Sequence, residues 1–382
     1  MDLDARLLDR CHINKNDEGD RFVGIKADSE NAMVYFPVGY QLPETDQEIR
    51  RDILHLISVL AEFTDKSDRV LAMKKFEAPQ SVDFPINAYM EVINYYLEQN
   101  SYYTEKEPVF KTSDRGSIDW AKTIRKQRPL IQSDGSPVYT EYTVRVSSPN
   151  DKNLITQIHK YCVYESFQKL GWLFTPDLPP KPTIEKNTKM FLSVLNDKLA
   201  RTNNDKNKHL FTAMIAVLKY IDEQTNLKQF YFGTDSFEYV WEKLIDRVYG
   251  IKDKYKFFPR TRWYLKGKVK ENYALEPDSI MLHNGKIYVL DAKYYRYGIT
   301  GNPMHLPESS SINKQITYGE YIYTQERFKR EYGDDVPVYN AFLMPYNSAK
   351  NVFGFDSIYG NIGEAKGDWK VGDHNYERVQ GI

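Results

Sequence analysis

The stretch PDSIMLHNGKIYVLDAK, residues 277–293, decides how the chemically richest part of this chain folds. Its apolar second half predicts a strand, and His283-Asn284-Gly285 before it predicts a hairpin turn. On that strand Asp291 and Lys293 would share one face, roughly 6.6 Å apart at about 3.3 Å per residue. The hairpin would fold the segment with Asp278 back beside them. The local pattern therefore predicts that three charged side chains meet at one point.

These side chains suit the hydrolysis of a phosphodiester, whose anionic oxygens repel a nucleophile. Mg²⁺ neutralises that charge, and it needs only one or two protein carboxylates beside waters and substrate oxygens. Asp278 and Asp291, with the carbonyl of Ala292, are therefore the expected metal ligands. Lys293 is expected to orient or deprotonate the attacking water. The alternative is an exposed strand end that carries a surface ion pair.

Two other acid-X-Lys strings in the chain serve as internal comparisons. Glu364-Ala365-Lys366 and Asp368-Trp369-Lys370 lie among glycines, and neither follows an apolar strand or a Pro-Asp pair. We interpret both strings as loop charges. The comparison indicates that the strand before Asp291 carries the prediction of a site, whereas the three-residue string by itself does not.

A predicted helix precedes the hairpin, with apolar residues at helical spacing over residues 236–250. Glu238 falls on or beside its buried stripe, where an unpaired carboxylate is costly. A role as a third metal ligand would explain this position, and so would a salt bridge to Arg247 or Lys243.

A second predicted helix follows the hairpin, from Ser310 to about Tyr332. It places Gln315 and Tyr318 one turn apart, where they could bond to the attacking water or to the phosphate. The alternative is that both are polar residues at a contact between helix and sheet.

Cationic residues lead into the hairpin and would approach the same site. Arg260, Arg262, Lys266 and Lys268 are the expected contacts to DNA phosphates, with a solvated strand edge as the alternative. The formal net charge of the chain is -1, which argues against a generally basic nucleic-acid binder. A nuclease needs only a local positive face, so this charge does not exclude one.

The order of these elements resembles the core of the PD-(D/E)XK nucleases. More narrowly, residues 237–242, 289–295 and 312–321 resemble the LlaJI restriction endonuclease family, whose members are relatives of the McrC nuclease subunit. Residues 116–124 are similar to a segment ahead of the nuclease core in the same group. One departure concerns Gln315 and Tyr318, which are three residues apart here, whereas related nucleases often space them by four.

The resemblance implies an α/β fold, α+β overall, in which helices flank a mixed β-sheet. It implies a type II or modification-dependent restriction endonuclease subunit that cuts double-stranded DNA with Mg²⁺ beside an McrB-like AAA+ GTPase. The chain contains no G-x-x-x-x-G-K-[ST] loop, so GTP would be hydrolysed only by that partner. Cleavage of both strands would call for a homodimer or a larger assembly.

Two other functions stay open. A non-catalytic subunit could bind DNA or assemble with a GTPase and stimulate it, although the intact Asp278, Asp291 and Lys293 argue against this. A repair or recombination nuclease would instead cut branched or single-stranded DNA without sequence preference.

The length of 382 residues predicts two domains. We expect an N-terminal α+β domain over residues 1–148, including a connecting region, for DNA recognition or partner binding. The nuclease domain would cover residues 149–382. Within the first domain, helices are expected at 46–63 and 87–98.

Cysteine content and hydropathy suggest a cytoplasmic protein. The two cysteines, Cys11 and Cys162, are far apart, and neither neighbours another Cys or a His pair at zinc-ligand spacing. No apolar run is long enough for a membrane span, and the N-terminus is acidic, unlike a signal peptide.

Overall fold

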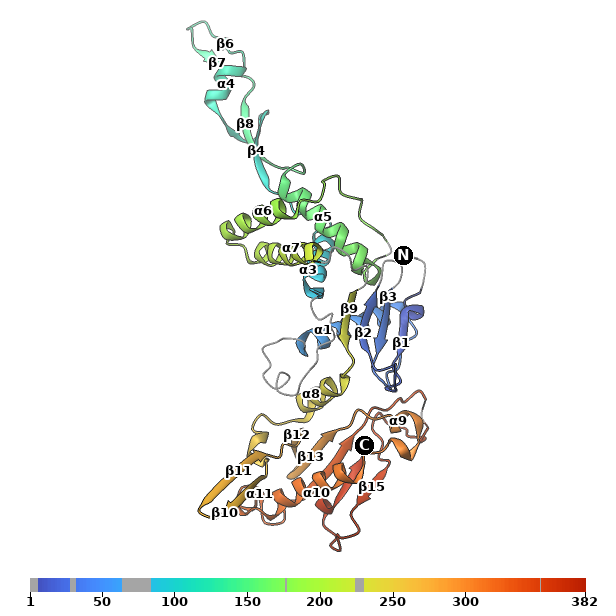
Figure 1. The fold of residues 1–382 in the computed structure, drawn as a ribbon. Helices are drawn as coiled ribbons and strands as arrows, with labels where there is room; N and C mark the ends of the chain where they lie inside the picture. The colour runs from blue at the N-terminus through green and yellow to red at the C-terminus, as the bar shows by residue number, and fades with distance from the viewer. Residues whose placement is uncertain (1–5, 28–31, 64–83, 176, 224–229, 351) are drawn as a thin grey trace. The chain divides into compact units, whose positions relative to one another are not determined.

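The computed structural model describes residues 6–27, 32–63, 84–175, 177–223, 230–350 and 352–382 (Figure 1). The chain divides into two compact units: unit 1 comprises Met1–Asp83 with Lys228–Ile382, and unit 2 comprises Phe84–Leu227. The expected boundary between residues 148 and 149 lies inside unit 2. Unit 1 instead joins the start of the chain to its last part.

The first sheet of unit 1 explains this division. Its strand order is β1-β3-β2-β9, with β1 parallel to β3 and the other pairs antiparallel. The strands are β1 (Cys11–Ile13), β2 (Val23–Ala27), β3 (Ala32–Phe36) and β9 (Phe230–Thr234). Because β9 pairs with β2 along its whole length, the chain returns to its N-terminal sheet only after unit 2 is complete. Helix α1 (Asp46–Phe63) packs on this sheet and has the predicted bounds.

The second sheet of unit 1 is mixed, in the order β12-β13-β14-β16-β15. Its central pairs, β13 with β14 and β14 with β16, are parallel, and the two outer pairs are antiparallel. The strands are β12 (Ser279–His283), β13 (Lys286–Ala292), β14 (Val338–Leu343), β15 (Gly363–Lys366) and β16 (Arg378–Gly381). Helices α8 (Phe237–Tyr249) and α10 (Ser309–Thr324) pack on it, so the predicted class of a mixed sheet flanked by helices is confirmed.

The predicted hairpin between β12 and β13 is confirmed. Ser279 pairs with Leu290, and the register continues without a break to His283 and Lys286. Asn284 and Gly285 both have positive φ, at 48° and 70°, which is the conformation of a two-residue turn that follows the twist of its strands.

Two predicted elements differ from the structure. The helix expected from Ser310 to Tyr332 is interrupted at Gln325, whose ψ of 123° is extended, and α11 (Glu326–Tyr332) follows it. The string Glu364-Ala365-Lys366 is not a loop but the edge strand β15. It pairs with β16, the strand that follows it in the chain, and this partner supplies the hydrogen bonds that its own weak β pattern does not predict.

Unit 2 combines four packed helices with a small sheet. The helices are α3 (Ile86–Gln99), α5 (Leu154–Leu170), α6 (Thr188–Arg201) and α7 (Asp205–Glu223). The sheet has the order β4-β8-β5, formed by β4 (Lys106–Thr112), β8 (Thr143–Pro149) and β5 (Ser117–Ile118). Helix α4 (Trp120–Lys126) and a hairpin of β6 (Leu130–Ile131) and β7 (Pro137–Val138) lie between β5 and β8 in the chain. Within the described ranges, no helix has the length and apolar character to cross a membrane.

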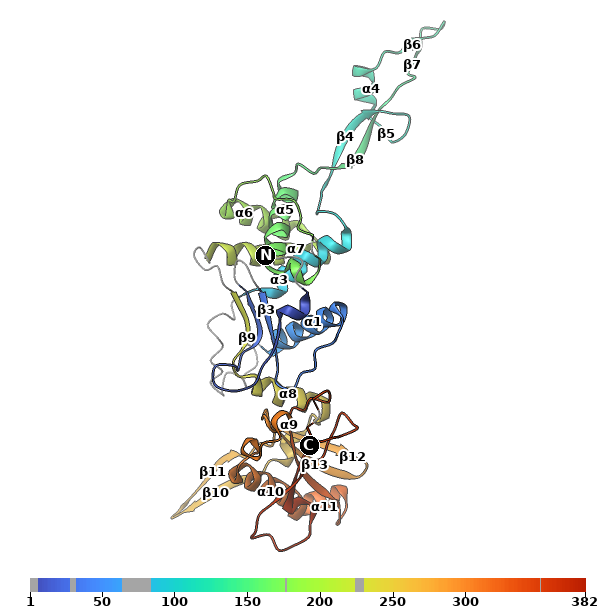
Figure 2. The same cartoon turned by 90° about the vertical axis from the view of Figure 1, so that its right-hand side faces the viewer.

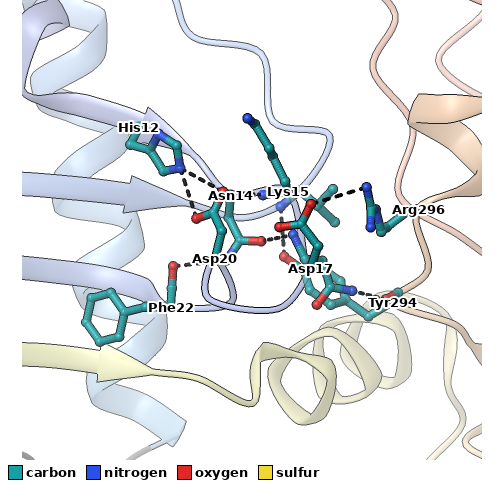
Figure 3. A network of polar contacts seen from close by, with 10 residues as sticks. His12, Asn14, Lys15, Asp17, Asp20, Phe22, Tyr294 and Arg296 are labelled. Atoms are coloured by element: carbon teal, nitrogen blue, oxygen red, sulfur yellow. Dashed lines mark hydrogen bonds and ion pairs between the residues drawn. The ribbon is translucent and has the colours of Figure 1, made fainter.

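The loop between β1 and β2 contacts the chain directly after Lys293 (Figure 3). The Asn16 side chain donates to the Tyr294 carbonyl at 2.8 Å, and Asp17 lies 3.4 Å from Arg296. The Asp20 carboxylate ties this loop to β1, since it lies 2.9 Å from the ring of His12. The N-terminal sheet therefore holds the segment that leaves the end of β13.

Candidate active site

Asp278 and Asp291 lie side by side because of the β12–β13 register. Asp278 is one residue before Ser279, the residue paired with Leu290, so it stands level with Asp291. The backbone N–H of Ala292 donates to Asp278 Oδ2 at 2.9 Å. Lys293 Nζ is 2.5 Å from Asp291 Oδ2. The structure thus brings together the three residues at the centre of the predicted site.

The environment of Asp278 disfavours its charged form. Burial, then the charge of Asp291, a hydrogen bond to Asp291 and the charge of Glu242, in decreasing order, together raise the pKa of this carboxyl to about 8. The N–H of Ala292 opposes the shift. The apposed carboxylates therefore make ionisation of Asp278 unfavourable, and a divalent cation between them would offset this cost.

A pocket of about 650 Å³ opens on these side chains. We call it the Asp278 pocket. Charged residues dominate its lining: Glu242, Lys243, Asp246, Lys254, Glu276, Asp278, Asp291, Lys293 and Lys314. Four lysines beside five carboxylates fit a site that holds both a cation and an anionic substrate.

Lys254 positions the backbone that carries Asp278. Its ammonium donates to the Asp278 carbonyl at 2.6 Å and to Asp246 Oδ2 at 2.7 Å. Asp246 belongs to α8, so Lys254 links this helix to the residue at the start of β12. The sequence analysis missed this residue, since nothing in its local pattern indicates the link.

On α8 the structure places a different carboxylate in the pocket from the one expected. Glu238 lines another pocket, together with Arg21, Arg296 and Ser310, and partial desolvation there raises the pKa of its carboxyl. The residues of α8 that line the Asp278 pocket are Tyr239, Glu242, Lys243 and Asp246. Their spacing of three, four and seven residues defines one face of the helix, and Glu238 lies beside that face. In the sequence, this spacing was the signal that could have indicated Glu242 as a residue of the site.

Gln315 is a contact between helix and sheet. Its side chain is 1% exposed, and its amide donates to the Val289 carbonyl at 2.7 Å. Tyr318 is also buried and donates to the Glu276 carbonyl at 3.2 Å. Neither side chain lines the Asp278 pocket, whereas the neighbouring Lys314 does. The geometry of both residues therefore fits the alternative, in which they are polar residues at a contact between helix and sheet. Gln315 is then a positioning residue for β13.

The four predicted phosphate contacts lie on or between β10 (Arg260–Leu265) and β11 (Lys268–Ala274), which form a separate two-stranded sheet. Arg262 pairs with Glu271 at 2.8 Å, and Arg260 is 3.9 Å from the same carboxylate. The sheet ends beside the Asp278 pocket, because Ala274 and the following Leu275 line it.

The residues fit a sparsely liganded metal better than a closed metal cage. In the part of the chain that the structure describes, no group of three or more His, Cys, Asp or Glu side chains is arranged to hold a metal ion. Two adjacent carboxylates, Asp278 and Asp291, are nonetheless a suitable donor set for Mg²⁺, which keeps several waters. Cys11 and Cys162 are free thiols outside this site.

A mixed sheet flanked by helices is a nuclease-like α/β fold, and it carries paired aspartates and a lysine where β12 and β13 meet. The model of the LlaJI restriction endonuclease family matches residues 22–362, and the chain belongs to this family. It is accordingly a nuclease of a restriction system.

Two solved structures from Thermococcus gammatolerans are similar to this chain. The first is an assembly of McrB AAA+ hexamers with bound McrC, at 14% identity and a TM-score of 0.39, with 95% of this chain and 77% of that chain covered. The second is the McrBC complex, at 18% identity and a TM-score of 0.24, with coverage of 60% and 65%. No curated protein matches the chain.

Proposed function

We propose that this chain is an Mg²⁺-dependent, site-specific endonuclease of the PD-(D/E)XK type that hydrolyses phosphodiester bonds of double-stranded DNA. One observation carries the proposal: Asp278, Asp291 and Lys293 converge in one pocket at the meeting point of two strands. Membership of a restriction endonuclease family supports it.

Asp278 and Asp291 would hold the Mg²⁺, with the Ala292 carbonyl and Glu242 beside them. The ion, when bound, would neutralise the phosphate and lower the pKa of an attacking water. Glu242 takes the place first considered for Glu238, since Glu242 lines the pocket. The N–H of Ala292 orients the Asp278 carboxylate for this role.

Lys293 would direct the water toward the phosphorus. Its ammonium contacts Asp291, and 18% of the Lys293 side chain is exposed. The ammonium therefore reaches the pocket without being fully solvated. Lys314, on the second turn of α10, would balance the charge of the phosphate oxygens. Gln315 would act through β13 by fixing Val289, two residues before Asp291.

We further propose that an AAA+ GTPase of the McrB type works beside this chain. The chain itself contains no phosphate-binding loop, so nucleotide hydrolysis would require another polypeptide. The motifs that resemble McrC relatives motivate the partner. Co-purification of the chain with such a GTPase, and GTP-dependent cleavage by the mixture, would test this part separately.

The catalytic assignment is tested with Lys293→Ala in a plasmid cleavage assay, with Mg²⁺ and with and without the GTPase and GTP. We expect the variant to lose at least about 100-fold in rate, as is typical when a group that acts on the attacking water is removed. It should still bind DNA. Lys366→Ala, from the comparison string on β15, is the matched control and should cut like the wild type.

Other outcomes would favour the alternatives. Equal cleavage by wild type and Lys293→Ala in every condition that supports restriction would overturn the catalytic assignment. Stimulation of a GTPase without any cleavage would instead indicate an assembly subunit. Preferential cutting of branched or single-stranded DNA would indicate a repair or recombination nuclease.

A further inference from the structure

We propose that β10 and β11 form a DNA-reading ribbon that enters the major groove of the duplex to be cleaved. The ribbon is defined as residues 260–274, and its tip is Lys266-Gly267. The proposal rests on the proposed function, because the occupant of the ribbon is the same double-stranded DNA. It adds to that function the element that would read the sequence beside the cleavage site.

The two strands of the ribbon pair with each other and with no other strand among the described residues. It forms a two-stranded sheet of its own, and both views show it projecting beside the larger sheet (Figures 1 and 2). All residues of β10 are exposed, and the exposed fractions of Trp263, Tyr264 and Tyr273 are 60%, 78% and 97%. An isolated two-stranded hairpin is only marginally stable in water. Exposed aromatic side chains on an uncovered ribbon indicate a binding surface.

The charge of the ribbon identifies the class of its partner. Five cations, Arg260, Arg262, Lys266, Lys268 and Lys270, stand against one carboxylate, Glu271, in a chain whose net charge is -1. Glu271 lies near both arginines, while the three lysines form no ion pair among the described residues. A concentrated positive charge on an exposed strand pair complements a phosphate backbone.

The strand register places different residues on the two faces of the ribbon. Cross-strand partners share a face, so Trp263 lies with Lys270 and Leu265 with Lys268 on one side. Tyr264 and Val269 form a pair on the other side, near the tip. A two-stranded ribbon fits the major groove, which is about 12 Å wide. The lysines would then reach phosphates at the groove walls, and Tyr264 and Val269 would face base edges.

The tip is narrow enough for this entry. Gly267 has a φ of 75°, and a side chain built there would meet no atom within 4 Å. The two-residue turn therefore projects into open space with little bulk. At the other end, the N–H of Leu275 donates to the Pro259 carbonyl at 2.8 Å and closes the base of the ribbon.

The base of the ribbon places the groove beside the pocket. Ala274 and Leu275 line the Asp278 pocket, and Val269 is five residues from Ala274 along β11. At about 3.3 Å per residue this is roughly 17 Å, or about five base pairs at 3.4 Å each. With the ribbon running along the groove, a base pair contacted by Val269 would therefore lie about half a helical turn from the cleaved phosphate.

Salt-dependent binding of a duplex to the full chain tests the phosphate contacts. The assay measures fluorescence anisotropy in the Lys293→Ala background, so that cleavage does not interfere. We expect the double variant Lys268→Gln/Lys270→Gln to bind at least about 10-fold more weakly. Its slope of log K against log salt concentration should fall by about 1.8, or 0.9 for each lost contact. Lys189→Gln, an exposed lysine on α6, is the control and should not change the slope.

The reading role is tested with Tyr264→Ala and Val269→Ser. We expect each to reduce discrimination among duplexes of different sequence, with a smaller effect on the salt slope. Circular dichroism would check that each variant is folded. Unchanged affinity, slope and discrimination in all ribbon variants would overturn the proposal, as would a wild-type chain that binds no duplex at low salt.

The same variants would also reveal a partner of the ribbon other than DNA. If sedimentation showed that the ribbon variants change the oligomeric state while DNA affinity stays constant, the ribbon would be an interface between copies and the proposal would be wrong. Intact ribbon-dependent binding without Mg²⁺-dependent cleavage would overturn the proposed nuclease function alone.

Discussion

Asp278 and Asp291 are held close enough to compete for one proton, and the hairpin that brings them together also supplies the N–H that orients Asp278. Two carboxylates in this arrangement gain stability from a proton or from a cation between them. Lys293 neutralises Asp291 alone, since its ammonium contacts that carboxylate. Substitution of a charged side chain that lines the Asp278 pocket is therefore expected to change how the site binds a cation.

Glu242 and Glu238, both on α8, allow a matched comparison of two single substitutions. Glu242→Gln should reduce Mg²⁺-dependent cleavage by at least about 10-fold and raise the Mg²⁺ concentration needed for half-maximal rate, because Glu242 lines the Asp278 pocket. Glu238→Gln should have little effect on either, because Glu238 lines another pocket. Cleavage rates across a Mg²⁺ titration provide the measurement, and the reverse ranking would contradict the placement.

Among the elements, α5 of unit 2 contains the most strongly shifted histidine. His159 is fully buried, and its Nδ1 accepts a hydrogen bond from the Tyr103 N–H at 2.8 Å. Burial lowers the pKa of His159 to about 3. Protonation would both charge the ring in an apolar interior and remove the acceptor of this bond. The α5 helix therefore packs stably only around a neutral imidazole.

This burial predicts a pH dependence of stability. The folded pKa lies below the unfolded value of about 6.5, so the contribution of neutral His159 is complete above that pH and is lost as pH falls toward 3. Its slope would be up to about 1.4 kcal/mol per pH unit. His159→Asn keeps an acceptor but does not titrate. Urea unfolding between pH 7 and 4 should show a flatter decline for the variant, and parallel curves would contradict the prediction.

Across unit 1 as a whole, Tyr294 joins the two sheets directly after Lys293. Its hydroxyl accepts a hydrogen bond from the buried Val38 N–H at 2.7 Å, and its carbonyl accepts from Asn16. Its ring packs on Phe237, with ring centroids 5.3 Å apart. The N-terminal sheet thus stabilises the segment that leaves the site.

Tyr294→Phe should destabilise unit 1 by about 1–3 kcal/mol, because it leaves the Val38 N–H buried without a partner. Tyr295→Phe, at the neighbouring and partly exposed position, is the control and should change stability by less than about 0.5 kcal/mol. Urea unfolding compares the two. Equal stability of both variants and wild type would show that the bond does not link the sheets.

Local chemistry allowed the sequence by itself to determine several features. Asn284-Gly285 tolerates positive φ, so it defines the hairpin, and the hairpin alone sets Asp278 beside Asp291. Helix α1 has a complete apolar stripe and needs no distant residue to define its bounds. The motifs around Lys293 were sufficient to identify the family, which the match over residues 22–362 confirms.

Only the tertiary structure decided which side chains of these elements face the pocket. The rotation of α8 about its axis is set by packing, and it turns Glu242 rather than Glu238 into the Asp278 pocket. Packing likewise directs Gln315 to the backbone of β13. The pairing of β2 with β9 depends on contacts between distant parts of the chain. Such contacts leave no local pattern, because each strand gains its hydrogen bonds only when its partner is already in place.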